Sequence, residues 1–150
     1  MSDKPSFIIT PIPKGVSIDK TKVKSIYLIG FIGDKIIATR NERGWDIPGG
    51  HLEEREEPID GVRREVEEEA GVSFDRAIPY AILSLPSEET CMLFFASNSC
   101  KIGDFIPKPD AFERELIDVE TLIERYHWDK NILRDLIEKA KESINVEKMG

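Results

Sequence analysis

The order of apolar and polar residues predicts several strands interrupted by a few helices. Two apolar runs at residues 24–32 and 35–40, separated by Gly33-Asp34, predict a β-hairpin. Similar runs predict further strands at residues 7–12, 77–85, 91–97 and 115–119. Because proline cannot donate a ladder hydrogen bond, Pro11 and Pro13 favour an edge position for the first of these strands.

Helices are predicted where apolar residues recur at three- and four-residue spacing. Pro58 suits the first turn of a helix over residues 58–70, and Gly71 suits a left-handed cap at its end. Residues 120–125 form a shorter helical segment, and Asp129 is the predicted cap of a last amphipathic helix. Strands interleaved with helices predict an α/β fold, a mixed sheet flanked by helices.

Three glutamates lie beside the apolar stripe of the helix at residues 58–70. Glu65, Glu68 and Glu69 stand at i, i+3 and i+4, so they project within about 100° of arc. The helix follows Gly49-Gly50, and glycines permit close approach of a ligand. Gathered carboxylates suit Mg²⁺ or Mn²⁺. The alternative is a solvated charged face, since like-charge pairs on a helix cost only about 0.2–0.5 kcal/mol each.

Composition narrows the choice of function. The net charge of −8 argues against binding a nucleic-acid polymer, and it also repels a polyphosphate unless a divalent cation bridges the two. The length of 150 residues predicts one domain, and two cysteines without a disulfide or metal-binding pattern predict a reduced, cytoplasmic protein. Neither a signal peptide nor a membrane-spanning run is expected.

The glutamates belong to a longer motif that carries a family resemblance. Gly50, Glu56 and residues 64–72 fit the pattern G-x5-E-x7-R-E-U-x-E-E-x-G-U without a gap, where U is aliphatic. This run resembles the signature of the Nudix hydrolases, and residues 44–50 and 115–122 resemble two flanking segments of that family. The resemblance implies an α/β/α sandwich around a mixed sheet, formed by a single Nudix domain over residues 1–150.

The resemblance also implies roles for individual residues. The implied metal ligands are Glu65, Glu68 and Glu69, with the backbone carbonyl of Gly49 as a further ligand. Arg64 would orient these carboxylates through its partner Glu56. Glu65 is the first choice of general base, and three loop carboxylates compete with it: Asp110, Glu113 and Glu115. Arg40 and Arg43 are candidates for contact with substrate phosphates, although solvent-exposed loop arginines are the simpler interpretation. The only histidines, His51 and His127, receive no role.

The predicted function is Mg²⁺-dependent hydrolysis of a pyrophosphate linkage in a small nucleoside diphosphate derivative. A MutT-type nucleoside triphosphate pyrophosphohydrolase is favoured because the chain is short. An ADP-ribose or ADP-sugar pyrophosphatase is the alternative, since Pro86 lies fourteen residues past Val72, near the position of a proline common in that group. A catalytically silent nucleotide-binding module would have substituted glutamates, and a non-hydrolytic isomerase is disfavoured by the intact motif. A homodimer remains open.

Overall fold

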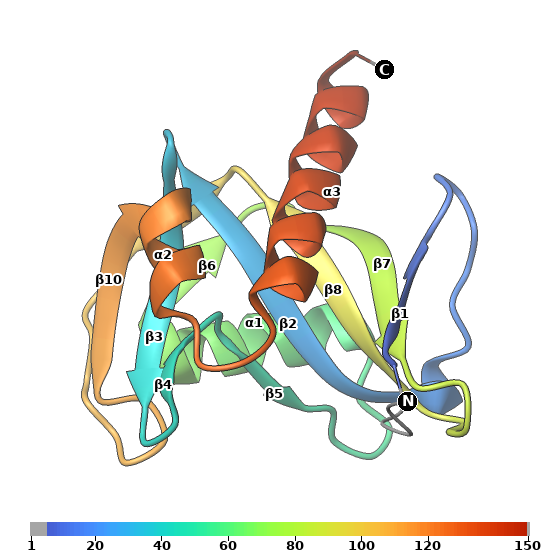
Figure 1. The fold of residues 1–150 in the computed structure, drawn as a ribbon, viewed down its shortest axis with the longest axis horizontal. Helices are drawn as coiled ribbons and strands as arrows, with labels where there is room; N and C mark the ends of the chain where they lie inside the picture. The colour runs from blue at the N-terminus through green and yellow to red at the C-terminus, as the bar shows by residue number, and fades with distance from the viewer. Residues whose placement is uncertain (1–5, 150) are drawn as a thin grey trace, which may run out of the picture.

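A mixed β-sheet forms the centre of the fold (Figure 1). The computed structural model describes residues 6–149. Its strands are β1 Ile8–Pro11, β2 Val23–Ile32, β3 Lys35–Asn41, β4 Gly44–Asp46, β5 Gly49–His51, β6 Val72–Phe74, β7 Ile78–Ser84, β8 Cys91–Ser97, β9 Cys100–Ile102 and β10 Glu113–Asp118. Its helices are α1 Pro58–Ala70, α2 Val119–Arg125 and α3 Lys130–Met149, and a 3₁₀ turn spans Lys20–Lys22.

The main sheet follows the strand order β1, β7, β8, β2, β3, β10, with β4 paired to β3 and β5 paired to β2. The strands β2 and β8 run parallel and the other neighbours run antiparallel. A separate pair is formed by β6 and β9. The sheet is therefore mixed, as predicted, and β1 lies at its edge.

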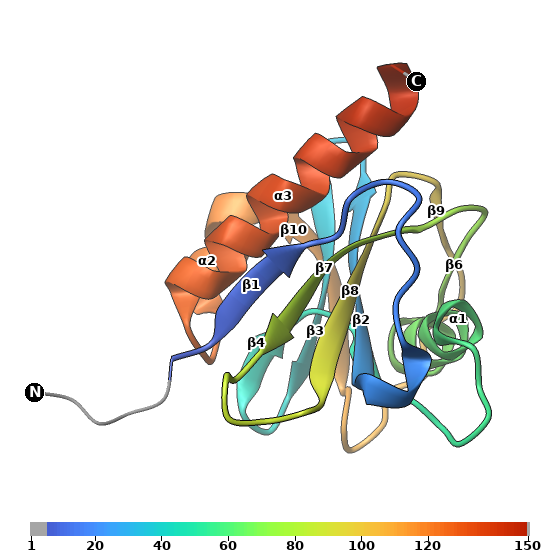
Figure 2. The ribbon, with the colours of Figure 1, turned by 90° about the vertical axis from the view of Figure 1, so that its right-hand side faces the viewer.

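Helices cover both faces of this sheet (Figure 2). On one face, Val62 and Val66 of α1 pack with Leu28 of β2 in one group of buried side chains. On the other face, Leu133 of α3 packs with Phe94 of β8 in a second group. The predicted α/β/α sandwich is confirmed, and the two helical layers have separate apolar cores.

The strand β2 changes partner along its length, and this change shapes the site described below. Residues Ser25 to Tyr27 pair with β5, whereas only Phe31 and Ile32 pair with β3. The strands β3 and β5 therefore diverge after the hairpin. Gly49 and Gly50 are the first two residues of β5, and they lie on its side of this divergence, against α1.

The predicted helices agree with the structure at their ends. The helix α1 spans residues 58–70, with Pro58 in its first turn and Gly71 in the left-handed conformation with φ of 63°. The last helix begins at Lys130, and Asp129 caps it by accepting a hydrogen bond of 3.0 Å from the N–H of Asn131. These ends agree because capping and periodicity act over a few neighbouring residues.

The strand predictions fail in two places. The pattern misses four strands of three residues each, β4, β5, β6 and β9, which are too short to show an alternation. The strand expected at residues 115–119 begins at Glu113. Glu113 and Glu115, expected as loop carboxylates, therefore belong to β10, where pairing with β3 extends the strand towards the N-terminus.

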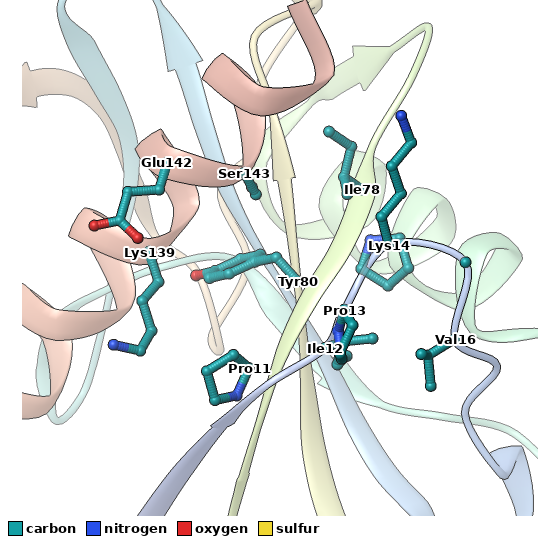
Figure 3. A pocket seen from close by; sticks show the side chains of 12 residues that line it. Pro11, Ile12, Pro13, Lys14, Val16, Ile78, Tyr80, Lys139, Glu142 and Ser143 are labelled. Carbon is teal, nitrogen blue, oxygen red and sulfur yellow. The ribbon is translucent and has the colours of Figure 1, made fainter. Parts of the chain in front are cut away.

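A cavity of about 400 Å³ lies between α3 and the edge of the sheet formed by β1 and β7. Figure 3 shows Tyr80 between α3 and the segment that carries Pro11 and Pro13. The Tyr80 hydroxyl donates to the carbonyl of Leu136 at 2.9 Å, which ties the strand to the helix. The residues that line this cavity do not include the glutamates of α1. Within residues 6–149, no helix combines the length and the apolar character needed to span a membrane.

Candidate active site

Helix α1 presents its glutamates at the boundary between the core and solvent. Val62, Val66 and Ala70 are buried, so the helix has one fixed orientation against the sheet. In this orientation the side chain of Glu65 is 16% exposed and that of Glu68 is 54% exposed. The glutamates that the sequence places on one side of the helix therefore differ in exposure: the carboxylate of Glu65 is nearly buried, and that of Glu68 is solvated.

Arg64 contacts several acidic side chains at once. Its Nε and Nη2 atoms donate to both carboxylate oxygens of Glu56, at 2.8 and 3.0 Å. Its Nη1 atom donates to Glu65 at 2.8 Å and to Glu68 at 3.4 Å. The backbone carbonyl of His51 accepts a further bond of 3.2 Å from Nη2. The predicted contact between Arg64 and Glu56 is present, and it is bidentate.

The charges of this cluster shift the pKa values of its members. The hydrogen bond from Arg64 lowers the pKa of the Glu56 carboxyl, and the same bond raises the pKa of the Arg64 guanidinium. Arg64 is 24% exposed and Glu56 is 15% exposed, so the pair is shielded from solvent. Because the planar guanidinium of Arg64 binds both oxygens of Glu56, its orientation is fixed. Its contact with Glu65 then determines where that carboxylate lies in the metal-free chain.

Glu69 has the most perturbed carboxyl of the site. Burial raises its pKa to about 8, against a hydrogen bond from the N–H of Gly49 that lowers it. The N–H of Gly49 lies 3.0 Å from Oε2 of Glu69. The negative charges of Glu65, Asp110 and Asp46 raise the pKa of Glu69 further. A shielded carboxyl among other carboxylates is a site where a cation is favoured electrostatically.

The two glycines allow this close packing. A Cβ atom at Gly50 would lie 2.5 Å from Oε2 of Glu65. A Cβ atom at Gly49 would lie 2.3 Å from the backbone oxygen of Ile26. Gly50 therefore leaves room for a carboxylate, whereas Gly49 leaves room for the neighbouring strand.

The donor set fits a hard divalent cation in its chemistry. Carboxylate oxygens and a backbone carbonyl are the ligands that Mg²⁺ and Mn²⁺ prefer. Within residues 6–149, no three acidic, histidine or cysteine side chains already surround a common point. Arg64 accounts for part of this arrangement, since its Nη1 atom contacts both Glu65 and Glu68. Binding of a cation by Glu65, Glu68 and Glu69 would therefore require these two carboxylates to turn away from Arg64.

The three competing carboxylates are in different environments. Asp110 is close enough to Glu69 for its charge to raise the pKa of that carboxyl, a shift in which burial is the largest cause. Glu113 pairs with Arg40 at 2.7 Å, across the register of β10 and β3. Glu115 lies 3.7 Å from the guanidinium of Arg125. Asp110 is therefore the one of these three carboxylates whose charge acts on the glutamates of α1 within the described residues.

The two candidate arginines also differ. Arg40 is held by Glu113 and lies over the ring of Phe112, 5.6 Å from its centroid. Arg43 lines a cavity of about 350 Å³ together with Asp110. In the described part of the chain, no carboxylate forms an ion pair with the guanidinium of Arg43. Of these two arginines, Arg43 is therefore the one whose guanidinium is available to an anionic ligand.

A third cavity, of about 310 Å³, lies where β5 pairs with β2 and is lined there by His51, Ser25 and Tyr27. Phe7, Leu83 and Met92 contribute apolar side chains, and Tyr27 contributes an aromatic ring that stacks on Phe94. Its polar lining residues are Lys24, Ser25, His51, Ser84, Glu88 and Thr90. An apolar floor with a few polar groups is typical of a site for a small organic ligand.

Asp46, Tyr126 and His127 belong to the site but have no role in the sequence predictions. His127 Nε2 lies 3.0 Å from Oδ2 of Asp46. Burial raises the pKa of the Tyr126 hydroxyl, and the charge of Asp46 adds to that shift while Arg43 opposes it. No local pattern indicates this grouping, because residues 46 and 127 are 81 positions apart.

Comparison with known proteins finds one matching family model and a set of solved structures with a similar fold. The family model described as the NUDIX domain matches residues 24–136. Among curated proteins, none matches the chain by sequence.

Three solved structures of the same fold are distant from this chain in sequence. The Bacillus subtilis pyrophosphohydrolase BsRppH has a TM-score of 0.69 and 18% identity, over 91% of this chain and 90% of that one. The MutT protein of Bacillus halodurans has a TM-score of 0.61 and 19% identity, over 75% and 80%. An ADP-ribose pyrophosphatase of Streptococcus suis has a TM-score of 0.50 and 23% identity, over 66% and 75%. At these identities the likeness shows the fold.

Proposed function

The chain belongs to the Nudix family of hydrolases, and on that premise we propose that it is a Mg²⁺-dependent enzyme that cleaves a pyrophosphate linkage in a nucleoside triphosphate, in the manner of MutT. The observation that carries this proposal is the carboxyl of Glu69. Its pKa is raised to about 8, first by burial and then by the charges of Glu65, Asp110 and Asp46. A divalent cation would neutralise this concentration of negative charge and permit an anionic substrate to approach.

The proposed metal ligands are Glu65, Glu68 and Glu69, with the backbone carbonyl of Gly49 as a further ligand. A bound Mg²⁺ would supply charge neutralisation at the phosphate oxygens and activate the attacking water. Mn²⁺ is an alternative with the same ligand preference. In the metal-free chain Arg64 binds Glu56 and contacts Glu65, so it fixes the place from which the Glu65 carboxylate would turn towards a bound cation.

Glu65 is the proposed general base, and Asp110 is its competitor. The side chain of Glu65 is 16% exposed and lies against Gly50, so it faces the strand β5 that borders the site. Glu113 and Glu115 are less suited to the role because of their position: they lie on β10 facing Arg40 and Arg125, whereas the charge of Asp110 acts on Glu69, whose pKa burial raises first.

The cavity beside Tyr27 is the proposed site for the nucleoside. Its volume of about 310 Å³ lies at the lower end of the range for ligand pockets, roughly 300–1,000 Å³. This size favours one nucleoside over a substrate with two. Arg43, which lines the neighbouring cavity with Asp110, is the proposed contact of a substrate phosphate.

An ADP-ribose or ADP-sugar pyrophosphatase is the second candidate. The turn between β7 and β8 contains Pro86, and Leu85 and Glu88 from the same turn line the proposed nucleoside cavity. A second ligand group could extend over this turn. A silent nucleotide-binding module is the third candidate, but every glutamate of the motif is present in this chain.

The decisive experiment is a substrate panel with Mg²⁺ in which the products are identified. The panel contains dNTPs, oxidised dNTPs, ADP-ribose, dinucleoside polyphosphates and NADH, and Glu69→Gln serves as the background control. Release of a nucleoside monophosphate and pyrophosphate from a triphosphate supports the proposal. Preferential cleavage of ADP-ribose supports the second candidate, and binding without hydrolysis of any member supports the silent module.

A matched pair of variants tests the phosphate contact. We expect Arg43→Ala to raise KM for the preferred nucleotide by on the order of tenfold, because it removes a charge-assisted hydrogen bond. Arg40→Ala is the control, since Arg40 is already held by Glu113. An equal rise in KM for both variants would reject the assignment of Arg43.

A further inference from the structure

The linker between α2 and α3 lies along β4, the strand that precedes Gly49 and Gly50 of β5. Tyr126 forms a parallel bridge with Trp45 of β4, and the N–H of His127 donates to the carbonyl of Trp45 at 3.2 Å. A Cβ atom at Gly44 would lie 3.1 Å from the Cβ of His127. The linker therefore approaches β4 so closely that a side chain at position 44 would press against it.

The side chain of His127 completes this contact by binding Asp46. Its Nε2 atom lies 3.0 Å from Oδ2 of Asp46, and the two side chains are only 19% and 16% exposed. The other carboxylate oxygen, Oδ1, accepts a bond of 2.8 Å from the N–H of Ile47. One oxygen of Asp46 is thus held by the linker, and the other is held by the backbone that continues to Gly49.

Asp46 is linked to the glutamate site in two ways: by its negative charge and by the backbone that connects it to Gly49. Its charge acts on Glu69, whose pKa is raised first by burial and further by Asp46. Gly49 lies three residues after Asp46, and its N–H donates a hydrogen bond to Glu69 at 3.0 Å. A displacement of the Asp46 side chain would therefore move a negative charge near Glu69 and would load the two-residue connection to Gly49, whose backbone pairs with Tyr27 of β2.

The linker is anchored independently of the imidazole of His127. The ammonium of Lys130 donates to the carbonyl of Ile123 at 3.1 Å, and Asp129 caps the first turn of α3. Arg125 lies over the ring of Trp45, 5.9 Å from its centroid. Removal of the His127 side chain thus leaves contacts that hold the linker on β4.

We propose that His127 is a positioning residue for the glutamate site: by binding Asp46 it fixes the segment from Asp46 to Gly49, and so it sets the hydrogen bond from Gly49 to Glu69. Within residues 6–149, His127 forms no hydrogen bond to the glutamates of α1 and does not line the proposed nucleoside cavity. It acts through Asp46. The effect on turnover rests on the proposed function, whereas the effect on the Gly49 amide is a property of the folded chain alone.

The first test uses the metal-free protein and the backbone amide resonance of Gly49. We expect His127→Ala to move the Gly49 amide proton upfield, because its hydrogen bond to Glu69 lengthens. His127→Gln should keep the wild-type position, since a glutamine amide can donate to Asp46 from a similar place. Arg125→Ala is the matched control, because it removes a contact with the same strand without touching Asp46. An unmoved Gly49 resonance in His127→Ala, or an equal shift in Arg125→Ala, would overturn the proposal.

The second test uses turnover of the substrate found with the panel. We expect His127→Ala to lower kcat by on the order of tenfold with little change in KM, as for other residues that orient a metal ligand indirectly. His127→Gln should restore most of the loss. In a double-mutant cycle, His127→Ala should add no further loss to Asp46→Ala, because both act through one contact. Additive losses would contradict the proposal. An inactive wild-type protein would reject the proposed function and leave the amide test intact.

Discussion

Gly49 and Glu69, twenty residues apart, are joined by a hydrogen bond of 3.0 Å from the backbone N–H to the carboxylate. This bond connects the first residue of β5 to the last part of α1. It lowers the pKa of Glu69 without overcoming the effect of burial, so the pKa stays raised at about 8. The site therefore holds a carboxyl whose ionisation costs free energy unless a cation is nearby.

The stability of the metal-free protein should depend on the protonation of Glu69. Its pKa is about 8 in the folded chain and about 4.3 when unfolded. Between these values the folded state holds a proton that the unfolded state has lost, so the free energy of unfolding falls as pH rises. Thermal unfolding in the presence of a chelator measures this. Glu69→Gln should lose this part of the pH dependence and should be more stable than wild type at pH 8, whereas equal Tm values at pH 8 would contradict the raised pKa.

Glu69→Gln should also abolish most of the hydrolytic activity. The substitution keeps the size of the side chain and removes a charged ligand, so we expect a loss greater than the roughly 10–100-fold typical of residues that only orient ligands. Initial rates over a Mg²⁺ titration measure the loss, and circular dichroism checks the fold. If a tenth of the wild-type turnover survives at saturating Mg²⁺, Glu69 is not a principal ligand.

Arg64→Lys tests whether Arg64 acts by orienting the carboxylates or only by its positive charge. Lysine keeps the positive charge but cannot reproduce the bidentate contact with Glu56 or the simultaneous contact with Glu65. We expect kcat to fall by about tenfold with only a small change in Tm without metal. A loss of stability in proportion to the loss of activity would indicate a purely structural role for Arg64.

The two adjacent glycines should respond differently to alanine. In Gly50→Ala, the new methyl group meets the end of the Glu65 side chain at 2.5 Å, and this side chain can turn away. We therefore expect a large loss of activity with a modest change in Tm. In Gly49→Ala, the methyl group meets the backbone oxygen of Ile26 at 2.3 Å, so the strand itself must shift and Tm should fall clearly. The reverse order of the two Tm values would show that Gly49 and Gly50 are not packed as described.

The choice of general base can be made from pH–rate profiles. If Glu65 accepts the proton, Glu65→Gln should lower kcat by roughly 10²–10⁴-fold and remove the acidic limb of the profile. Asp110→Asn should cause a smaller loss. Glu113→Gln and Glu115→Gln should cause the smallest, because these carboxylates face Arg40 and Arg125 on the sheet. A larger loss in Asp110→Asn, with Glu65→Gln changing only the Mg²⁺ requirement, would assign the base to Asp110.

The helix α1 and its arc of glutamates follow from the sequence alone. Its first turn at Pro58, its left-handed cap at Gly71 and its apolar stripe are all read from neighbouring residues. These features are predictable because the helix places each side chain relative to its neighbours by a fixed rotation and rise. The pairing of Arg64 with Glu56, which precedes the helix, is instead implied by the resemblance to the Nudix signature.

The surroundings of the helix depend on the tertiary structure. The pairing of Arg40 with Glu113 follows from the register of β3 and β10, and the contact of Asp46 with His127 follows from the path of a linker 81 residues away. The short strands β4 and β5 carry no alternation that a pattern can detect. The physical reason is that these contacts are set by the order and register of strands, which the packing of the whole sheet determines, whereas capping and periodicity act within a few residues.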